Sequence, residues 1–243
     1  MRQPRPGPGI GHALTPEQEL ACALRICARA GWHENLSGHI TIATADGGML
    51  CNPWGMWWEE VTASDILRLD ADGEVVQGRW DVTPAVFLHT ELHRARSDAT
   101  VIVHNHPYYA TLLANLGVLP RILHQNASIF DDELVLVDEY SGVEDANDGK
   151  WLAREVGRAS GILLAHHGAI VTAPTVAEAC YKAATFERMC RFTYDALVAR
   201  HDAPELPTDA RAAMKPVLRQ NAPQAYWDGA VRLLVRDEPD VLS

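Results

Sequence analysis

The sequence predicts an α/β fold, a three-layer α/β/α sandwich built on a central mixed, largely antiparallel sheet. Short apolar segments of strand length alternate along the chain with longer segments of helical periodicity. Short turns rich in Asp and Gly join some of the strands, which makes those strands antiparallel neighbours. With 243 residues, 47% hydrophobic and 22% charged, the chain is long enough for one sizeable core. Helices packed on a single sheet are a stable way to bury such a pattern.

Five helices are expected before residue 201, and the ends of the first are clearly marked. Thr15 is its expected N-cap, Pro16 its first residue and Gly31 its end. The expected helices cover residues 15–31, 83–98, 107–117, 147–159 and 175–200, of which the last is the longest. Residues 201–243 are punctuated by prolines, so this segment is expected to form several short helices.

Strands are expected between these helices, and three parts of the chain follow from the pattern. The expected strands cover residues 39–44, 48–53, 99–106, 133–140 and parts of 159–173, with a hairpin turn at 45–48 and another around residues 72–73. We expect a flexible N-terminal arm at 1–14, a catalytic domain at 15–200 and a helical C-terminal appendage at 201–243. One hypothesis is that the appendage closes over the site and contributes Tyr226 or Trp227.

Charge and composition narrow the classes of partner and compartment. The formal net charge of −11 disfavours nucleic acid and anionic membrane surfaces as partners. No apolar run approaches the roughly 20 residues that a membrane-spanning helix needs. The five cysteines are odd in number and scattered, which predicts reduced thiols and a cytoplasmic protein. A glycine fingerprint for dinucleotides and a phosphate-binding P-loop are both missing from the sequence.

Two segments that end in histidines predict a metal site. His104 and His106 lie two apart at the end of one strand, so their side chains share a face of the sheet. His166 and His167 follow each other in a second strand, so at most one of them faces that pair. Three imidazoles with an open coordination position are typical of catalytic metal sites. The alternative is that both segments are merely polar strand ends.

Four other histidines are weaker candidates. His89 and His93 are four residues apart on an expected helix. We expect His93 at the surface and His89 directed toward the site. His39 and His124 lie in polar segments, where substrate contact and simple solvation are both open.

Four segments, in this order, resemble the class II aldolase/adducin family: ENLSGHITIA at 34–43, NPWG at 52–55, VIVHNHPYYATLLA at 101–114 and LLAHHGAIV at 163–171. A long helical pattern follows them, and the resemblance runs from about Gly31 to Arg200. It implies one divalent ion per subunit, Zn, Mn or Fe, held by His104, His106 and His166. It also implies a homotetramer with active sites at subunit interfaces.

The chain departs from the family's sugar-phosphate aldolases at the position of their acid/base glutamate. That glutamate lies 19 residues before the first metal histidine, where this chain has Ala85. The resemblance also aligns Gln125 with a tyrosine that those enzymes use as a proton donor from a neighbouring subunit.

The segments that resemble the phosphate-binding loops differ as well. Gly38-His39 replaces a glycine-asparagine pair, Trp54-Gly55 a threonine-glycine pair, and Thr83 with Pro84 the nearby serines. These changes disfavour cleavage of phosphosugars. The residues expected to bind substrate are Ser37, Gly38, Trp54, Gly55 and Thr83.

These features predict a metal-dependent carbon–carbon lyase that acts on a small acidic molecule. Decarboxylation needs no base to start, because the carboxylate is already ionised, so it tolerates the missing glutamate. In this the chain resembles family members that decarboxylate ortho-hydroxy aromatic acids such as dihydroxyphthalate in catabolic pathways, and the resemblance implies the same reaction here. An aromatic substrate also suits the tryptophans at 54, 57 and 58, although ordinary packing explains them equally well. His39, His89 and His124 are candidate proton donors.

Further activities on the same site stay open. An aldolase or dehydratase acting on a small hydroxy-carbonyl compound would use the same ligands, as would an Fe(II) oxygenase. Outside enzymology, the chain could be a non-catalytic module like the domain of adducin.

Overall fold

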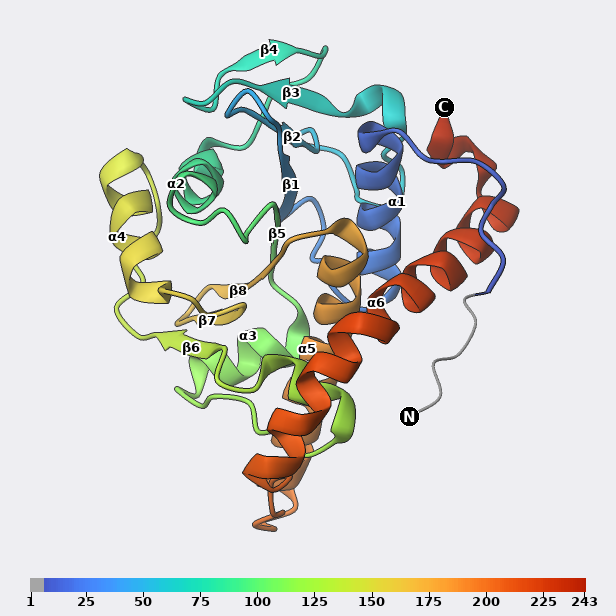
Figure 1. Cartoon of the computed structure of the whole chain (residues 1–243). Coiled ribbons are helices and arrows are strands. Elements are labelled where there is room, and N and C mark those ends of the chain that lie inside the picture. Colours follow the sequence, from blue (N-terminus) through green and yellow to red (C-terminus); the bar gives the residue numbers. More distant parts are fainter. Residues whose placement is uncertain (1–6) are drawn as a thin grey trace.

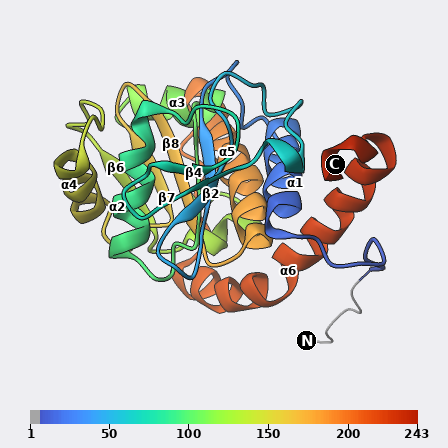
Figure 2. The same cartoon turned by 90° about the horizontal axis from the view of Figure 1, so that it is seen from above.

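The computed structural model describes residues 7–243, so residues 1–6 of the expected N-terminal arm lie outside the described part. Its centre is an eight-stranded sheet in the order β4-β3-β2-β1-β5-β8-β7-β6 (Figures 1 and 2). The strands are β1 (His39–Ala43), β2 (Met49–Cys51), β3 (Leu67–Leu69), β4 (Val75–Gln77), β5 (Val101–Asn105), β6 (Leu134–Val137), β7 (Gly161–Leu164) and β8 (Gly168–Ala173). Every neighbouring pair is antiparallel except β6 and β7, which confirms the predicted mixed, largely antiparallel sheet.

Helices cover both faces of this sheet. They are α1 (Pro16–Arg29), α2 (Phe87–Ala95), α3 (Tyr108–Asn115), α4 (Ala146–Val156), α5 (Val176–Val198) and α6 (Thr208–Asp237). Figure 1 shows α2 and α4 on one side of the sheet and α1, α5 and α6 on the other. Alternate residues of β5 follow this division, since Val101 and Val103 pack with α1 and α5 while Ile102 packs with α2 and α4. The three-layer prediction is therefore confirmed.

Local signals set the helix ends and the hairpins. Thr15 caps α1 through a capping box with Gln18, and Gly31 follows the helix with a φ of 89°. The predicted hairpins are present, as β1–β2 and β3–β4. All five cysteines are free and buried. Within residues 7–243, no helix combines the length and the apolar character that crossing a membrane requires.

The C-terminal segment differs from the prediction of short helices. Residues Thr208–Asp237 form one helix of 30 residues, longer than the 23 residues of α5, and it continues through Pro216 and Pro223. Figure 2 shows its curved path around the lower edge of the molecule. Trp227, Val231 and Leu234, spaced by four and three residues, are buried in the main core. Burial of this stripe outweighs the hydrogen bonds that the two prolines cannot make.

Gly161 at the start of β7 offers a test of core packing. A Cβ there would lie 2.7 Å from Phe186 and 2.9 Å from both Leu134 and Phe130. We expect Gly161→Ala to lower the free energy of unfolding by about 1–3 kcal/mol in urea titrations, because the crowded rings must shift. Gly229→Ala on α6 is the control, since its Cβ meets only Arg232 at 3.8 Å. A neutral Gly161→Ala would contradict this account of the packing.

Candidate metal and substrate site

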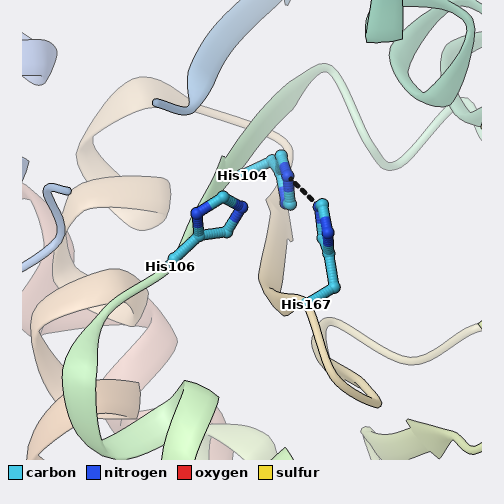
Figure 3. Close-up of side chains that lie close together, drawn as sticks. All are labelled: His104, His106 and His167. Atoms are coloured by element: carbon cyan, nitrogen blue, oxygen red, sulfur yellow. Dashed lines mark hydrogen bonds between the residues drawn. The ribbon is translucent and has the colours of Figure 1, made fainter. Parts of the chain in front are cut away.

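Strand β5 delivers two histidines to the site. His104 is the fourth residue of β5 and pairs with His39 on β1, while His106 follows the end of the strand. The ring centroids of His104 and His106 lie 5.5 Å apart, and Figure 3 shows both rings turned into the same space. The predicted convergence of this pair is present.

The third histidine of the cluster is His167, and the prediction of His166 is corrected. Each of His104, His106 and His167 offers one nitrogen, and these nitrogens lie within 4.8 Å of one another. The prediction assumed an extended chain, but residues 165–167 form the turn between β7 and β8. His166 occupies the left-handed region of this turn, at φ 57°, and is exposed. His167 instead stacks parallel to His104, with 3.1 Å between their Nε2 atoms (Figure 3).

Close backbone packing brings these three rings together. A Cβ on Gly168 would lie 2.5 Å from the His106 ring and 2.6 Å from the carbonyl oxygen of Asn105. The buried Asn105 side chain accepts a hydrogen bond from the His106 N–H and donates one to the carbonyl of Ser37. Gly38, at φ 86°, would place a Cβ 2.4 Å from the same side chain. Glycines at 38 and 168 therefore permit the approach of three separate segments.

Hydrogen bonds orient the imidazoles so that their Nε2 atoms face each other. The His104 Nδ1–H donates to the carbonyl of Ala169 at 3.0 Å. The His106 Nδ1–H donates to the carboxylate of Glu34, a contact between residues 72 apart that no sequence pattern indicated. His106 Nε2 is buried and has no hydrogen-bond partner among residues 7–243.

Such outward hydrogen bonds from Nδ1 are typical of histidines that bind metal. A divalent ion bonded at about 2.0–2.1 Å to each Nε2 would satisfy the orphaned nitrogen. Burial also lowers the pKa of His167 to about 4 and that of His104 well below its ordinary value, which favours the neutral, ligating form.

A cavity of about 250 Å³ opens beside the three histidines. Its lining residues are Leu36, Ser37, Gly38, His39, Asn52, Pro53, Trp54, Thr83, Ala85, His104, His106 and His167. Four of the predicted substrate-binding residues are among them, namely Ser37, Gly38, Trp54 and Thr83. Gly55 does not line the cavity of one chain, and its φ of 85° lies in the turn with Trp54, so its role in substrate binding stays a prediction.

The tryptophan cluster divides into separate roles. Trp54 lines the cavity and is 60% exposed. Trp58 is buried in the core, where its indole N–H donates to the carbonyl of Gly38 at 3.3 Å. Trp57 is exposed and does not line the cavity. Only Trp54 is therefore placed to contact a substrate within this chain.

Ala85 lines the cavity, at the position where the family resemblance places a glutamate. It lies in the 3-10 turn Pro84–Val86 that leads into α2, and Thr83 caps this turn through the N–H of Ala85. A methyl group here can neither donate nor accept a proton. Among residues 7–243, no lysine or arginine lines the cavity of one chain.

The three candidate proton donors occupy different places. His39 lines the cavity and is 7% exposed, whereas His89 is fully buried behind it, with 2.7 Å between His39 Nδ1 and His89 Nε2. His124 packs its ring on Phe192 and does not line the cavity of its own chain, so its role as a proton donor stays a prediction. His93, expected at the surface, instead lies partly buried, hydrogen-bonded to Thr41.

Comparison with known proteins identifies the family. The family model described as Class II Aldolase and Adducin N-terminal domain matches residues 18–194. The chain belongs to this family. L-fuculose 1-phosphate aldolase from Glaciozyma antarctica PI12 has the same fold, with a TM-score of 0.81 at 21% identity over 93% of this chain and 91% of that one.

Two Streptomyces proteins are similar in sequence. Decarboxylase NovR of Streptomyces niveus is 30% identical over 176 residues, covering 70% of this chain and 65% of that protein. The 4-hydroxy-3-prenylphenylpyruvate oxygenase/4-hydroxy-3-prenylbenzoate synthase of Streptomyces roseochromogenus subsp. oscitans is 31% identical, covering 70% of this chain and 64% of that protein. This class II aldolase and adducin family member therefore spans slightly less than two thirds of either relative.

Metal content tests the assignment of the third histidine. We expect elemental analysis of the purified protein to find about one divalent ion per chain. His104→Ala and His167→Ala should remove the ion, because each deletes a converging nitrogen. His166→Ala is the matched control and should keep it, since that side chain is exposed. Loss of metal in His166→Ala with retention in His167→Ala would reverse the assignment.

The contact between Glu34 and His106 gives a second prediction. Glu34→Ala should weaken metal binding by about 10–100-fold, because the carboxylate orients the ring and raises the basicity of its Nε2. Glu34→Gln should recover part of this loss, since its amide oxygen still accepts from Nδ1–H. Competition with a chromogenic chelator measures both variants, and unchanged affinity in Glu34→Ala would show that the contact does not support the ligand.

Proposed function

We propose that this chain is a divalent-metal-dependent carbon–carbon lyase that decarboxylates an ortho-hydroxy aromatic carboxylic acid. The observation that carries the proposal is the combination of three converging histidines with Ala85 on the wall of the same cavity. An aldol cleavage needs a base for the substrate hydroxyl, and Ala85 cannot provide one. A decarboxylation starts from an ionised carboxylate: the carbon–carbon bond breaks to release CO₂, the charge left on carbon is stabilised, and a proton then takes the place of the lost CO₂.

His104, His106 and His167 would hold the ion in this proposal. When bound, a divalent ion supplies Lewis-acid chemistry, polarising substrate oxygens and stabilising developing negative charge. No lysine or arginine in the described part of the chain lines the cavity. The positive charge for a substrate carboxylate would therefore come from the ion held by these histidines. The same lack of cations disfavours a phosphate group at the far end of the cavity.

The remaining walls suit a flat aromatic ring. Trp54 presents an exposed indole at the cavity, and Pro53 and Ala85 add apolar surface. Ser37 and Thr83 provide hydroxyl groups for polar substituents on the ring. The decarboxylase name of the Streptomyces niveus relative supports this class of reaction.

An Fe(II) oxygenase is the second candidate, favoured by the oxygenase name of the Streptomyces roseochromogenus relative. Three histidine ligands suit iron as well as zinc or manganese. A dehydratase or aldolase acting on a small hydroxy-carbonyl compound would use the same three ligands, whereas a non-catalytic adducin-like module would not need them.

The setting of this activity is part of the same proposal. We propose a cytoplasmic homotetramer in a catabolic pathway, with active sites at subunit interfaces. The five buried free thiols support a reducing compartment, and the exposure of Trp54 leaves room for a neighbouring subunit at the cavity mouth.

Substrate turnover tests the proposed reaction. We expect the protein, loaded separately with Zn²⁺, Mn²⁺ or Fe²⁺, to release CO₂ from members of a panel of hydroxylated phthalates, benzoates and pyridine dicarboxylates. His167→Ala should abolish this release and His166→Ala should leave it unchanged, because only the former loses a cavity nitrogen. The assays use detection of CO₂ with and without dioxygen.

Two results would reject the decarboxylase proposal. Cleavage of L-fuculose 1-phosphate without CO₂ release from any acid would mean that another group replaces the missing glutamate. Turnover with iron that requires dioxygen, and none with zinc or manganese, would select the oxygenase.

A further inference from the structure

A buried row of polar side chains leads away from the cavity between the sheet and α2. His39 and Thr41 are alternate residues of β1, so they share the face of the sheet that α2 covers (Figure 1). His89 and His93 are four residues apart on α2 and face this strand. The row runs from His39 to His89, then to Thr41 and His93, and ends at the carbonyl of Ala99.

The end of the row at Ala99 sets the direction of its first hydrogen bonds. A carbonyl oxygen only accepts, so the Nδ1 of His93, 2.7 Å away, must be the donor. A neutral His93 then has an unprotonated Nε2, which accepts from the Thr41 hydroxyl at 2.8 Å. Because this bond uses the single hydroxyl proton of Thr41, its oxygen must accept from His89 Nδ1–H at 2.7 Å.

The same logic continues to the cavity. With its proton on Nδ1, a neutral His89 has an unprotonated Nε2, which accepts from His39 Nδ1–H at 2.7 Å. His39 then carries its proton on Nδ1 and a lone pair on Nε2. His39 lines the cavity, and its Nε2 makes no hydrogen bond to any residue from 7 to 243.

The neutral state that this direction requires is the state that burial favours. Burial lowers the pKa of His93 to about 4, and it lowers the pKa of the fully buried His89 well below its ordinary value. No carboxylate hydrogen-bonds to any of the three rings among the described residues. The hydrogen-bond distances and the burial therefore agree on one proton arrangement.

We propose that His93, Thr41 and His89 are positioning residues that hold His39 as the Nδ1–H tautomer, so that His39 Nε2 accepts a hydrogen bond from a substrate hydroxyl. The identity of the hydroxyl-bearing ligand rests on the proposed function, whereas the tautomer does not. An unprotonated nitrogen attracts a hydroxyl and repels a carboxylate or phosphate oxygen. His39 would thus select a hydroxyl group beside the carboxylate, which would lie next to the ion held by the three histidines.

Nuclear magnetic resonance tests the tautomer directly in the full chain without substrate. Two-bond ¹H–¹⁵N correlation spectra of protein labelled with ¹⁵N-histidine distinguish a protonated ring nitrogen from an unprotonated one. We expect His39, assigned from the peaks lost in His39→Gln, to be protonated on Nδ1 and unprotonated on Nε2. A His39 protonated on Nε2 would overturn the proposal, whatever reaction the protein catalyses.

A matched pair of variants tests whether the row holds this tautomer. Thr41→Ser keeps the hydroxyl and should keep the wild-type His39 pattern. Thr41→Val keeps the shape but removes the relay, so we expect a second His39 form protonated on Nε2. An unchanged His39 pattern in folded Thr41→Val would overturn the positioning role. If Thr41→Val does not fold, His93→Phe makes the same test, since it also removes an acceptor from the row.

Ligand affinity tests the role of His39 Nε2 separately. In the zinc-loaded protein, salicylate should bind more tightly than 2-methoxybenzoate, which cannot donate a hydrogen bond. His39→Phe should shrink this ratio by about threefold to tenfold, the effect of one lost hydrogen bond. An unchanged ratio would overturn the hydroxyl contact. Failure of both ligands to bind would reject the ortho-hydroxy acid as ligand, while the tautomer result would stand.

Discussion

The site depends on one repeated interaction, a hydrogen bond from the Nδ1–H of a histidine ring to an acceptor within the protein. His104 uses the carbonyl of Ala169, His106 the carboxylate of Glu34 and His39 the ring of His89. A neutral ring held in this way has its lone pair on the opposite nitrogen, Nε2. Several nitrogen lone pairs then lie close together, and such a site favours binding of a cation and of a hydroxyl group that donates a hydrogen bond.

Register explains why these partners meet. Pairing of His39 with His104 and of Asn105 with Ala169 places β1, β5 and β8 side by side at the centre of the sheet. A slip of one residue in β1 would turn His39 to the opposite face, where Ile40 packs against α1 and α5. The hydrophobic alternation that fixes the core therefore also fixes the polar site.

Much of this arrangement was predictable because local rules govern it. Periodicity and turn residues placed most helices and both hairpins, and the spacing of His104 and His106 predicted their shared face. The choice between His166 and His167 failed because the rule of alternating faces holds only for an extended chain, and residues 165–167 turn. The single helix α6 was missed because proline signals outweighed a buried stripe that only the tertiary core reveals. Glu34 and the row behind His39 depend on contacts between distant segments, which one sequence does not specify.

Helix α2 links the missing glutamate to the buried row. The 3-10 turn that leads into α2 places Ala85 on the cavity wall. His89 and His93 lie on α2 itself, about one and two helical turns after Ala85. A glutamate at residue 85 would add an anion that competes for any proton delivered near His39. With alanine at residue 85, β1 still provides one hydrogen-bond acceptor without a partner, the Nε2 of His39, which the buried row keeps unprotonated. Ala85 and the buried row therefore act on the same cavity, which has no carboxylate at residue 85 and one uncharged hydrogen-bond acceptor at His39.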